Sequence, residues 1–397
     1  MEKIDKKTET KTLKIVSMKK ITIGFYSSRP LEDKRNWSGT MYKMYEQILK
    51  HGYEVVWIPV VQLSESQQKI YSFIEKSMQK IFNRGYNQHI NLYKSLVLSK
   101  KLKNAIMRQK IDILFAPTAV CELAFLKTDI PIIYLNDANI AQLLNYYPYY
   151  SGFGILSKRE TLWLERKTLN NVDVAIFSSE WAVDFAKKHY QIPTEKIKLL
   201  KFGANLEVPE HLPSRRAIDG EYRFLFLAVN WERKRGTLAF ETLKILKNKG
   251  YNVKLTIVGC EPNIQENWVE IIPFLNKNNP ADLQKIQDFL LTSHFLFVPT
   301  EADCTPIVFC EASGYGLPII STDTGGVSAH IENGKTGILL PKNATAEDYA
   351  HEIEKLLQHP EQILEKSQNA RTKYEKELNW ENWGNQFNDI IKNILSQ

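Results

Sequence analysis

The chain has 397 residues, which is enough for two domains of about 200 residues, each with its own core. Hydrophobic residues make up 43% and charged residues 24%, as in a soluble globular enzyme. The net charge of +7 suits anionic partners such as nucleotides, phospholipid head groups or nucleic acid, without choosing among them. The sequence contains no run of eighteen apolar residues, which excludes a membrane-spanning helix.

The cysteines and the first residues bear on the compartment. The four cysteines show neither CxxC nor mixed Cys and His spacing: Cys121, Cys260, Cys304 and Cys310. We therefore expect reduced thiols in a cytoplasmic protein rather than disulfides or a zinc site. Residues 1–18 are rich in Lys, Glu and Thr and lack a long apolar core, so we expect a disordered tail and no signal peptide.

A first domain is expected over residues 19–205, where short apolar strands alternate with helical patterns. Its strands are predicted at residues 21–26, 53–59, 111–116, 131–135, 172–177 and 197–202. Gly39 begins the first helix, and a glycine there lets a ligand approach the backbone and the positive end of the helix dipole. A helix start without a ligand is the alternative. No GxGxxG motif follows the first strand, which argues against an ordinary NAD-binding domain.

Residues 64–110 are predicted to form one or two basic helices. Lysines such as Lys69, Lys76 and Lys80 are interleaved there with aromatic residues such as Phe73. This pattern is suited to peripheral contact with an anionic membrane surface. The solvated exterior of a helix gives the same pattern more often, so both interpretations stay open.

Asp137 follows the strand predicted at 131–135, in a segment that ends with the aromatic run Tyr146-Tyr147-Pro148-Tyr149-Tyr150. A carboxylate just beyond a strand end in a doubly wound domain points into the crevice between domains. There Asp137 could orient or deprotonate an acceptor hydroxyl, with the aromatic residues as a platform. Its alternative role is the N-cap of a helix over residues 138–144.

A polar, turn-rich linker is expected over residues 206–221, before a second domain over residues 222–378. Its first strand, at 222–229, runs into Asn230 and then Arg233, Lys234 and Arg235. Cations between a strand end and a helix N-terminus form an anion site, because their charges and the helix amides converge. A surface turn is the alternative. Further strands are predicted at 253–258 and 269–272, with helices at 281–291, 346–358, 361–377 and 380–395.

The most informative stretch covers residues 295–326. A buried strand at 295–298 leads through an acidic loop into a helix at 307–313, and a second strand follows at 317–321. Asp303 precedes the helix and Glu311 lies inside it, so both carboxylates can face one ligand from different heights. The loop of Cys304, Thr305, Pro306, Ile307 and Val308 is suited to a diphosphate. Two ordinary solvated acidic residues are the alternative.

This stretch resembles the signature of the family 4 retaining glycosyltransferases, which have the GT-B fold. Two acidic residues separated by seven, here Asp303 and Glu311, precede Ala312, Gly316-Leu317-Pro318 and Gly325-Gly326. The family usually has Glu at the first acidic position and Gly-Phe-Gly after it. This chain has Asp303 and then Cys304-Thr305-Pro306 instead. Many members also place a His near the position of Asp137.

The resemblance implies a fold and a set of roles. The fold would be α/β, with two Rossmann-like doubly wound domains facing across a cleft and a last helix, within residues 379–397, that crosses back to the first domain. Residues 19–205 would serve the acceptor and residues 222–378 the donor. By this resemblance Asp303 holds the donor sugar, Glu311 the ribose, and Lys234 with Arg233 or Arg235 the diphosphate. Binding of the donor would further involve Thr305, Pro306, Ile307, Val308, Gly39, Phe274, Asn230 and Lys277.

We therefore expect a retaining transferase that moves a hexose from a nucleoside diphosphate sugar, with UDP as the family-weighted donor, to a hydroxyl of a glycan or lipid-linked acceptor. Without a DxD motif, side-chain cations would replace a metal, and no cofactor is expected. The enzyme would be cytoplasmic, and peripheral membrane contact would place it at the inner face of the membrane. The alternatives are a silent nucleotide-sugar-binding subunit, or an epimerase or phosphorylase of the same architecture. Nucleic-acid binding ranks low, because the basic residues fall at strand ends.

Overall fold

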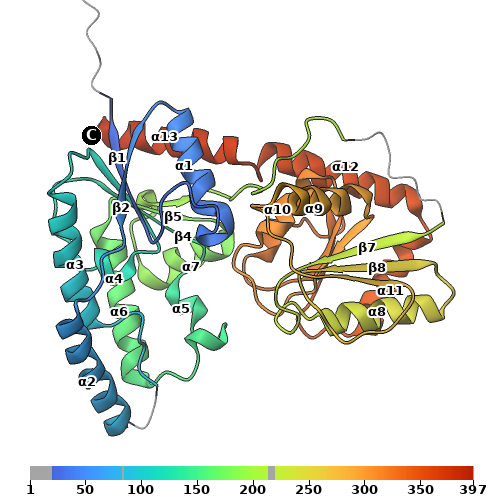
Figure 1. Ribbon diagram of the computed structural model, residues 1–397, viewed down its shortest axis with the longest axis horizontal. Coiled ribbons are helices and arrows are strands. Elements are labelled where there is room, and N and C mark those ends of the chain that lie inside the picture. The colour runs from blue at the N-terminus through green and yellow to red at the C-terminus, as the bar shows by residue number, and fades with distance from the viewer. Residues whose placement is uncertain (1–19, 83–84, 213–219, 397) are drawn as a thin grey trace, which may run out of the picture.

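The computed structural model of the protein describes residues 20–82, 85–212 and 220–396. Two α/β domains lie side by side, each built around one six-stranded sheet (Figure 1). The expected tail at residues 1–18 lies outside the described residues, as does the central part of the expected linker. Along the described part of the chain, no helix combines the length and the apolar character needed to cross a bilayer.

The sheet of the first domain is entirely parallel, with the strand order β2-β1-β3-β4-β5-β6. Parallel strands covered by helices on both faces need continuous apolar runs, and every residue of β3 and β4 is buried. The strands are β1 Thr22–Ser27, β2 Glu54–Pro59, β3 Ile113–Pro117, β4 Ile132–Asn136, β5 Val174–Phe177 and β6 Ile197–Leu199. The predicted strands therefore all form, with ends that differ by a few residues.

Helices and short turns connect these strands. The predicted basic insert forms two helices, α2 Glu65–Phe82 and α3 Leu92–Ile106, on the outer side of the domain (Figure 1). The other helices of this domain are α1 Thr40–Lys50, α4 Val120–Leu123, α5 Ile140–Leu143, α6 Ile155–Asn171 and α7 Glu180–Tyr190.

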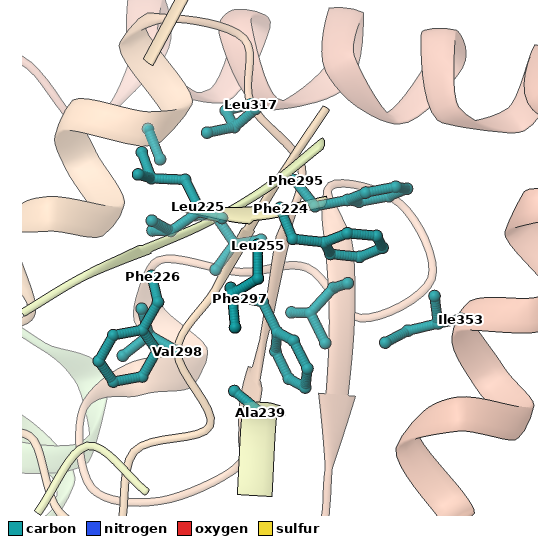
Figure 2. Close-up of a cluster of buried hydrophobic side chains, with 14 of the residues drawn as sticks. Phe224, Leu225, Phe226, Ala239, Leu255, Phe295, Phe297, Val298, Leu317 and Ile353 are labelled. Carbon is teal, nitrogen blue, oxygen red and sulfur yellow. The ribbon is translucent and has the colours of Figure 1, made fainter. Parts of the chain in front are cut away.

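The second sheet is also entirely parallel, with the strand order β9-β8-β7-β10-β11-β12. Its core is aromatic: the rings of Phe224 and Phe295 stack at 4.9 Å, beside Phe226 and Phe297 (Figure 2). The strands are β7 Tyr222–Leu227, β8 Val253–Val258, β9 Val269–Ile272, β10 Phe295–Phe297, β11 Ile319–Thr322 and β12 Gly337–Leu340. The helices are α8 Gly236–Asn248, α9 Pro280–Thr292, α10 Ile307–Gly314, α11 Ala346–Leu357 and α12 Pro360–Lys376.

The strand order of the second sheet determines where a ligand can bind. β7 and β10 are neighbours, but the chain leaves β7 toward β8 and leaves β10 toward β11, on opposite sides. At such a reversal the loops beyond the carboxyl ends diverge and leave a crevice, which is the usual ligand site of open α/β sheets. The loop with Lys234 and the loop with Asp303 are the two that meet there.

The last helix, α13 Trp380–Leu395, returns to the first domain and lies along α1 (Figure 1). Its apolar stripe completes that domain's core: the ring of Phe387 lies 4.9 Å from Phe115, and Trp380 stacks on Phe202 at 5.7 Å. A side chain at Gly203 would collide with the backbone of Trp380. The crossing helix expected within residues 379–397 and the two doubly wound domains are confirmed.

Candidate functional site

A cavity of about 690 Å³ lies where the carboxyl ends of β7 and β10 face the first domain, and we call it the cleft cavity. From the first domain it is lined by Lys34, Arg35, Trp37, Ser38, Asp137 and Tyr147. From the second it is lined mainly by the loops after β7, β9 and β10 and by the first turns of α10. Both sheets thus present the ends of their strands to one space.

The basic turn after β7 delivers two cations to the cleft cavity. The Asn230 side chain accepts from the N–H of Arg233 at 2.8 Å, which closes the turn. Lys234 is buried and its ammonium pairs with the carboxylate of Asp303, while the Arg233 guanidinium donates to the Ala302 carbonyl at 2.8 Å. Arg235 is not among the lining residues, because it donates to the Lys342 carbonyl at 3.0 Å. Of the two candidate arginines, the structure therefore brings Arg233 to the cavity.

The acidic loop and α10 form the opposite wall. α10 begins at Ile307 after the N-cap Pro306, so the positive end of this helix lies at the cavity. One turn further, the buried carboxylate of Glu311 forms an ion pair with Lys277, with 2.6 Å between Oε1 and Nζ. Lys277, for which a phosphate contact was expected, is therefore a partner of Glu311 in this structure.

Asp137 faces Asp303 from the first domain. Burial, and next the charge of Asp303, raise the pKa of the Asp137 carboxyl to about 7. The alternative role of Asp137 as a helix N-cap is wrong, because α5 begins at Ile140 and its N-cap is Asn139. The first N–H groups of that helix, those of Ile140 and Ala141, donate instead to the buried carboxylate of Glu165, at 2.6 and 3.1 Å.

One wall of the cleft cavity is apolar and open. Phe274 is 65% exposed and Val229 is 70% exposed, although both are large apolar side chains. Gly259, with φ +93°, lies beside them, and a side chain there would press against the Ala228 carbonyl at 2.6 Å. Exposed apolar faces beside a polar cavity are typical of a surface that a flat ligand covers.

Of the predicted site residues, Gly39, Asn230, Cys304 and Arg235 do not line the cleft cavity, and the others do. The Asn230 side chain is used to close its own turn. Gly39 has φ +93° and is the N-cap of α1, so it lies behind the segment that reaches the cavity. The residues of this segment that line the cavity are Trp37 and Ser38, one and two residues before the predicted Gly39.

The sequence did not identify the segment before Gly39 as part of the site, although this segment extends from the first domain into the lining of the cleft cavity. Trp37 and Ser38 both have left-handed backbones, with φ 48° and 55°. The amide of Asn205 holds this unfavourable conformation by donating to the Ser38 carbonyl at 2.8 Å, and Asn205 accepts from the Trp380 indole at 3.0 Å. The available signal was the basic, turn-rich run after β1, which includes Lys34 and Arg35.

A further cavity of about 670 Å³ lies within the first domain, and we call it the first-domain cavity. It meets the cleft cavity at Trp37 and Asp137, which line both. Its other polar and aromatic lining residues include Gln62, Gln68, His89, Lys94, Thr118, Glu122, Asn136, Tyr149 and Tyr150. Burial raises the pKa of Glu122, which accepts from the Tyr26 hydroxyl at 3.2 Å. Amides, carboxyls and phenol rings together suit a polyhydroxyl ligand.

Two family models match the chain, one on each domain. The model described as "Glycosyltransferase Family 4" matches residues 40–208, and the model described as "Glycosyl transferases group 1" matches residues 208–376. The second match includes the basic turn and the acidic loop that line the cleft cavity.

Curated relatives match over shorter stretches. A D-inositol 3-phosphate glycosyltransferase of Gordonia bronchialis is 29% identical over 112 residues, which is 28% of this chain and 23% of the relative. The amylovoran biosynthesis glycosyltransferase AmsK of Erwinia amylovora is 25% identical over 213 residues, or 51% of this chain and 52% of the relative. The matches thus span about a quarter to a half of these relatives' lengths.

Solved structures match over nearly the whole chain, at low identity. A glycosyltransferase from Rickettsia africae has a TM-score of 0.65 at 14% identity, covering 95% of this chain and 99% of that one. HepE of Anabaena, solved in complex with UDP and glucose, has a TM-score of 0.62 at 14% identity, covering 94% and 100%. At this identity the likeness concerns the fold.

Proposed function

Because this chain belongs to the family 4 glycosyltransferases and has their GT-B fold, we propose that it is an enzyme that moves a hexose from a nucleoside diphosphate sugar to a hydroxyl group. The observation that carries the proposal is the convergence at the cleft cavity. Lys234, Arg233 and the first turn of α10 supply positive charge there, beside the carboxylates of Asp303 and Glu311. A sugar diphosphate needs this combination, because its phosphates take cations and amides while its hydroxyls take carboxylates.

The donor would lie along the second domain. The base would cover the exposed faces of Phe274 and Val229, and the ribose hydroxyls would bond to Glu311. The diphosphate would then reach the start of α10 and the side chains of Lys234 and Arg233. A UDP donor is supported by the structural relative HepE, which was solved with UDP and with UDP-glucose.

The chemistry would retain the configuration of the sugar. The bond between the anomeric carbon and the diphosphate oxygen breaks, and the electron pair leaves with the diphosphate. Lys234, Arg233 and the α10 amides stabilise that growing charge and take the place of a metal. The acceptor oxygen bonds to the anomeric carbon on the same face, and its proton passes to the departing diphosphate. Asp303 holds the sugar hydroxyls during this exchange.

The acceptor would occupy the first-domain cavity, with its reacting hydroxyl at Asp137. This carboxyl lies at the junction of the two cavities, where a group held between donor and acceptor must be. The lining of amides, carboxyls and tyrosines favours a glycan or the sugar of a lipid-linked acceptor. Relatives named for amylovoran and capsular polysaccharide biosynthesis support this class.

Peripheral contact with a membrane is proposed for α2. Phe73 is 74% exposed and Ile70 is 53% exposed. Lys69, Lys76 and Lys80 surround Phe73 at helical spacing, so one face of the helix is both apolar and cationic. Such a face can lie on an anionic lipid surface and bring a lipid-linked acceptor to the enzyme.

The experiment is the release of nucleoside diphosphate from a panel of sugar nucleotides, with and without glycan acceptors. Lys234→Ala should lower kcat by about a hundredfold or more, because it removes charge from the departing diphosphate. Glu311→Ala should mainly raise KM for the donor. Equal background release by the wild type and both variants would overturn the enzyme proposal. Nucleotide binding without turnover would point to a silent binding subunit, and an altered free sugar to an epimerase.

A further inference from the structure

The first domain holds the acidic loop of the second domain through three side chains. The Tyr146 hydroxyl accepts from the N–H of Asp303 at 3.0 Å and lies 3.3 Å from the carbonyl of the same residue. The Ser178 and Thr305 hydroxyls lie 2.6 Å apart, and the Tyr147 hydroxyl lies 3.5 Å from the Cys304 sulfur. The loop that carries Asp303 is therefore fixed by contacts from the opposite domain.

Tyr146 makes the most extensive of these contacts. Besides both backbone groups of Asp303, its hydroxyl meets the Thr324 hydroxyl at 3.1 Å. A side chain at Gly325 would collide with the Tyr146 hydroxyl and with the Asp303 carbonyl. The space for the phenol thus depends on a glycine of the second domain, which has a left-handed φ of +57°.

The turn that carries Tyr146 also reaches both cavities. Asn145 has φ +63°, a conformation that Asn tolerates better than most residues, and its N–H donates to the Tyr150 carbonyl at 3.1 Å. The turn thereby places Tyr147 in the lining of the cleft cavity and Tyr149 and Tyr150 in the lining of the first-domain cavity. One short segment lies between the proposed donor and acceptor positions.

We infer that Tyr146 is a positioning residue that fixes Asp303 against the donor sugar, and that it does so only while the two domains are in contact. The inference rests on the proposed function, because it assigns Asp303 to the sugar. On this inference, the donor sugar is aligned correctly only when the first domain, which would hold the acceptor, contacts the loop of Asp303. The nucleotide contacts would not depend on Tyr146, since Phe274, Glu311 and Lys277 belong to the second domain alone.

The test is Tyr146→Phe, which removes the hydroxyl and keeps the ring on Trp181, whose centroid lies 5.7 Å away. We expect kcat to fall about tenfold, because the Asp303 N–H loses its acceptor and the loop is free to shift. The Kd of the free nucleoside diphosphate should stay within about twofold of wild type. The wild type should bind the sugar nucleotide with a lower Kd than the nucleoside diphosphate, because Asp303 contacts the sugar. In the variant the two Kd values should become nearly equal.

Tyr222→Phe is the matched control, since its hydroxyl donates to the Leu357 carbonyl at 2.7 Å, at the opposite end of β7 from the basic turn. Thr324→Val removes the hydroxyl that meets the Tyr146 hydroxyl and should also lower kcat. In the double variant, the two effects on kcat should not add. If Tyr146→Phe behaves like Tyr222→Phe, the inference fails and the proposed function stands. The inference also fails if Tyr146→Phe loses nucleoside diphosphate binding and turnover in equal measure. A wild type that neither binds nor turns over any donor overturns both.

Discussion

Asp137 and Asp303 place two carboxyl groups on the cleft cavity, one from each domain. Lys234 compensates the charge of Asp303 directly through their ion pair, whereas burial is the main influence on Asp137. Burial and the charge of Asp303 therefore both favour protonated Asp137, and its pKa of about 7 lies inside the working range of an enzyme. A carboxyl group with this pKa is partly ionised near pH 7, and its ionised form can accept a hydrogen bond from the acceptor hydroxyl.

The first prediction is a pH dependence set by Asp137. Its raised pKa means that the carboxyl is protonated below about pH 7 and ionised above it. If the carboxylate accepts a hydrogen bond from the acceptor hydroxyl, kcat/KM for the acceptor should rise as the pH increases through about 7. Asp137→Asn should lower kcat/KM and flatten this limb, measured as initial transfer rates from pH 5.5 to 8.5.

A control separates this limb from titration elsewhere in the protein. Hydrolysis of the donor without acceptor should not show the same rise, because water needs no alignment by Asp137. A limb that persists unchanged in Asp137→Asn would contradict the assignment.

At the scale of elements, the strands and helices could be predicted because each buries a recognisable face. The parallel strands are continuous apolar runs, and the helices carry an apolar stripe, as α13 does with Trp383, Phe387 and Ile391. The strand ends then located Lys234 and Asp303. The segment at Trp37 and Ser38 could not be located in this way, because its backbone is held by Asn205, far away in sequence.

Tyr146 illustrates the same limit. The sequence shows an aromatic run, and nothing local to it indicates that one hydroxyl meets the backbone of Asp303 in the other domain. Contacts between loops leave no periodic pattern in the sequence, so they can be identified only from the three-dimensional structure. Which arginine of the basic turn faces the ligand also depends on a contact between loops, the hydrogen bond from Arg235 to the Lys342 carbonyl within the second domain.

The second prediction concerns the segment at Trp37 and Ser38. Asn205→Ala removes the amide that donates to the Ser38 carbonyl and the oxygen that accepts from Trp380. The free energy of unfolding should fall by about 1–3 kcal/mol, measured by denaturant titration, because the left-handed segment loses its hydrogen bond and the indole of the buried Trp380 loses its acceptor. KM for the donor should also rise, since the segment lines the cleft cavity.

The matched control is Asn170→Ala, whose exposed amide donates to the Arg166 carbonyl within its own helix. It should change the free energy of unfolding by no more than about 0.5 kcal/mol. Equal effects from both variants would show that the left-handed segment does not depend on Asn205.

The third prediction concerns the face of α2. Lys69→Gln with Lys76→Gln should weaken binding to vesicles that contain anionic lipid by about tenfold or more, since each lysine near such a surface contributes ~1 kcal/mol. Lys187→Gln with Lys188→Gln is the control, because these exposed lysines lie on α7, in another part of the domain. Sedimentation with vesicles measures both. Equal losses, or binding to uncharged vesicles alone, would contradict a specific basic face.

At the scale of the whole molecule, two sheets of different strand order present their carboxyl ends to one cavity. Residues 34–38 follow β1 and Asp137 follows β4, while Lys234 follows β7 and Asp303 follows β10. Each domain alone would offer an open half-site at its own strand ends. Only together do they enclose a space that can hold a donor against an acceptor and limit the access of water.

The fourth prediction tests how the last helix contributes to the first domain. Trp383→Ala should lower the free energy of unfolding by about 3–5 kcal/mol, because the side chain is fully buried between α1 and the sheet. Hydrogen exchange should accelerate in β3 and change little in β10. Leu395→Ala is the control, as this side chain is 46% exposed. Faster exchange in the second sheet instead would contradict the packing described above.

The position of α13 also has a consequence for biosynthesis. The first domain leaves the ribosome before the second, yet the apolar surface at Phe115 and Phe202 that packs against Phe387 and Trp380 is covered only when residues 380–391 have been translated. During synthesis of the whole second domain, that apolar surface remains uncovered. A nascent chain of this protein must therefore shield it with a chaperone, or risk aggregation, until translation reaches the closing helix.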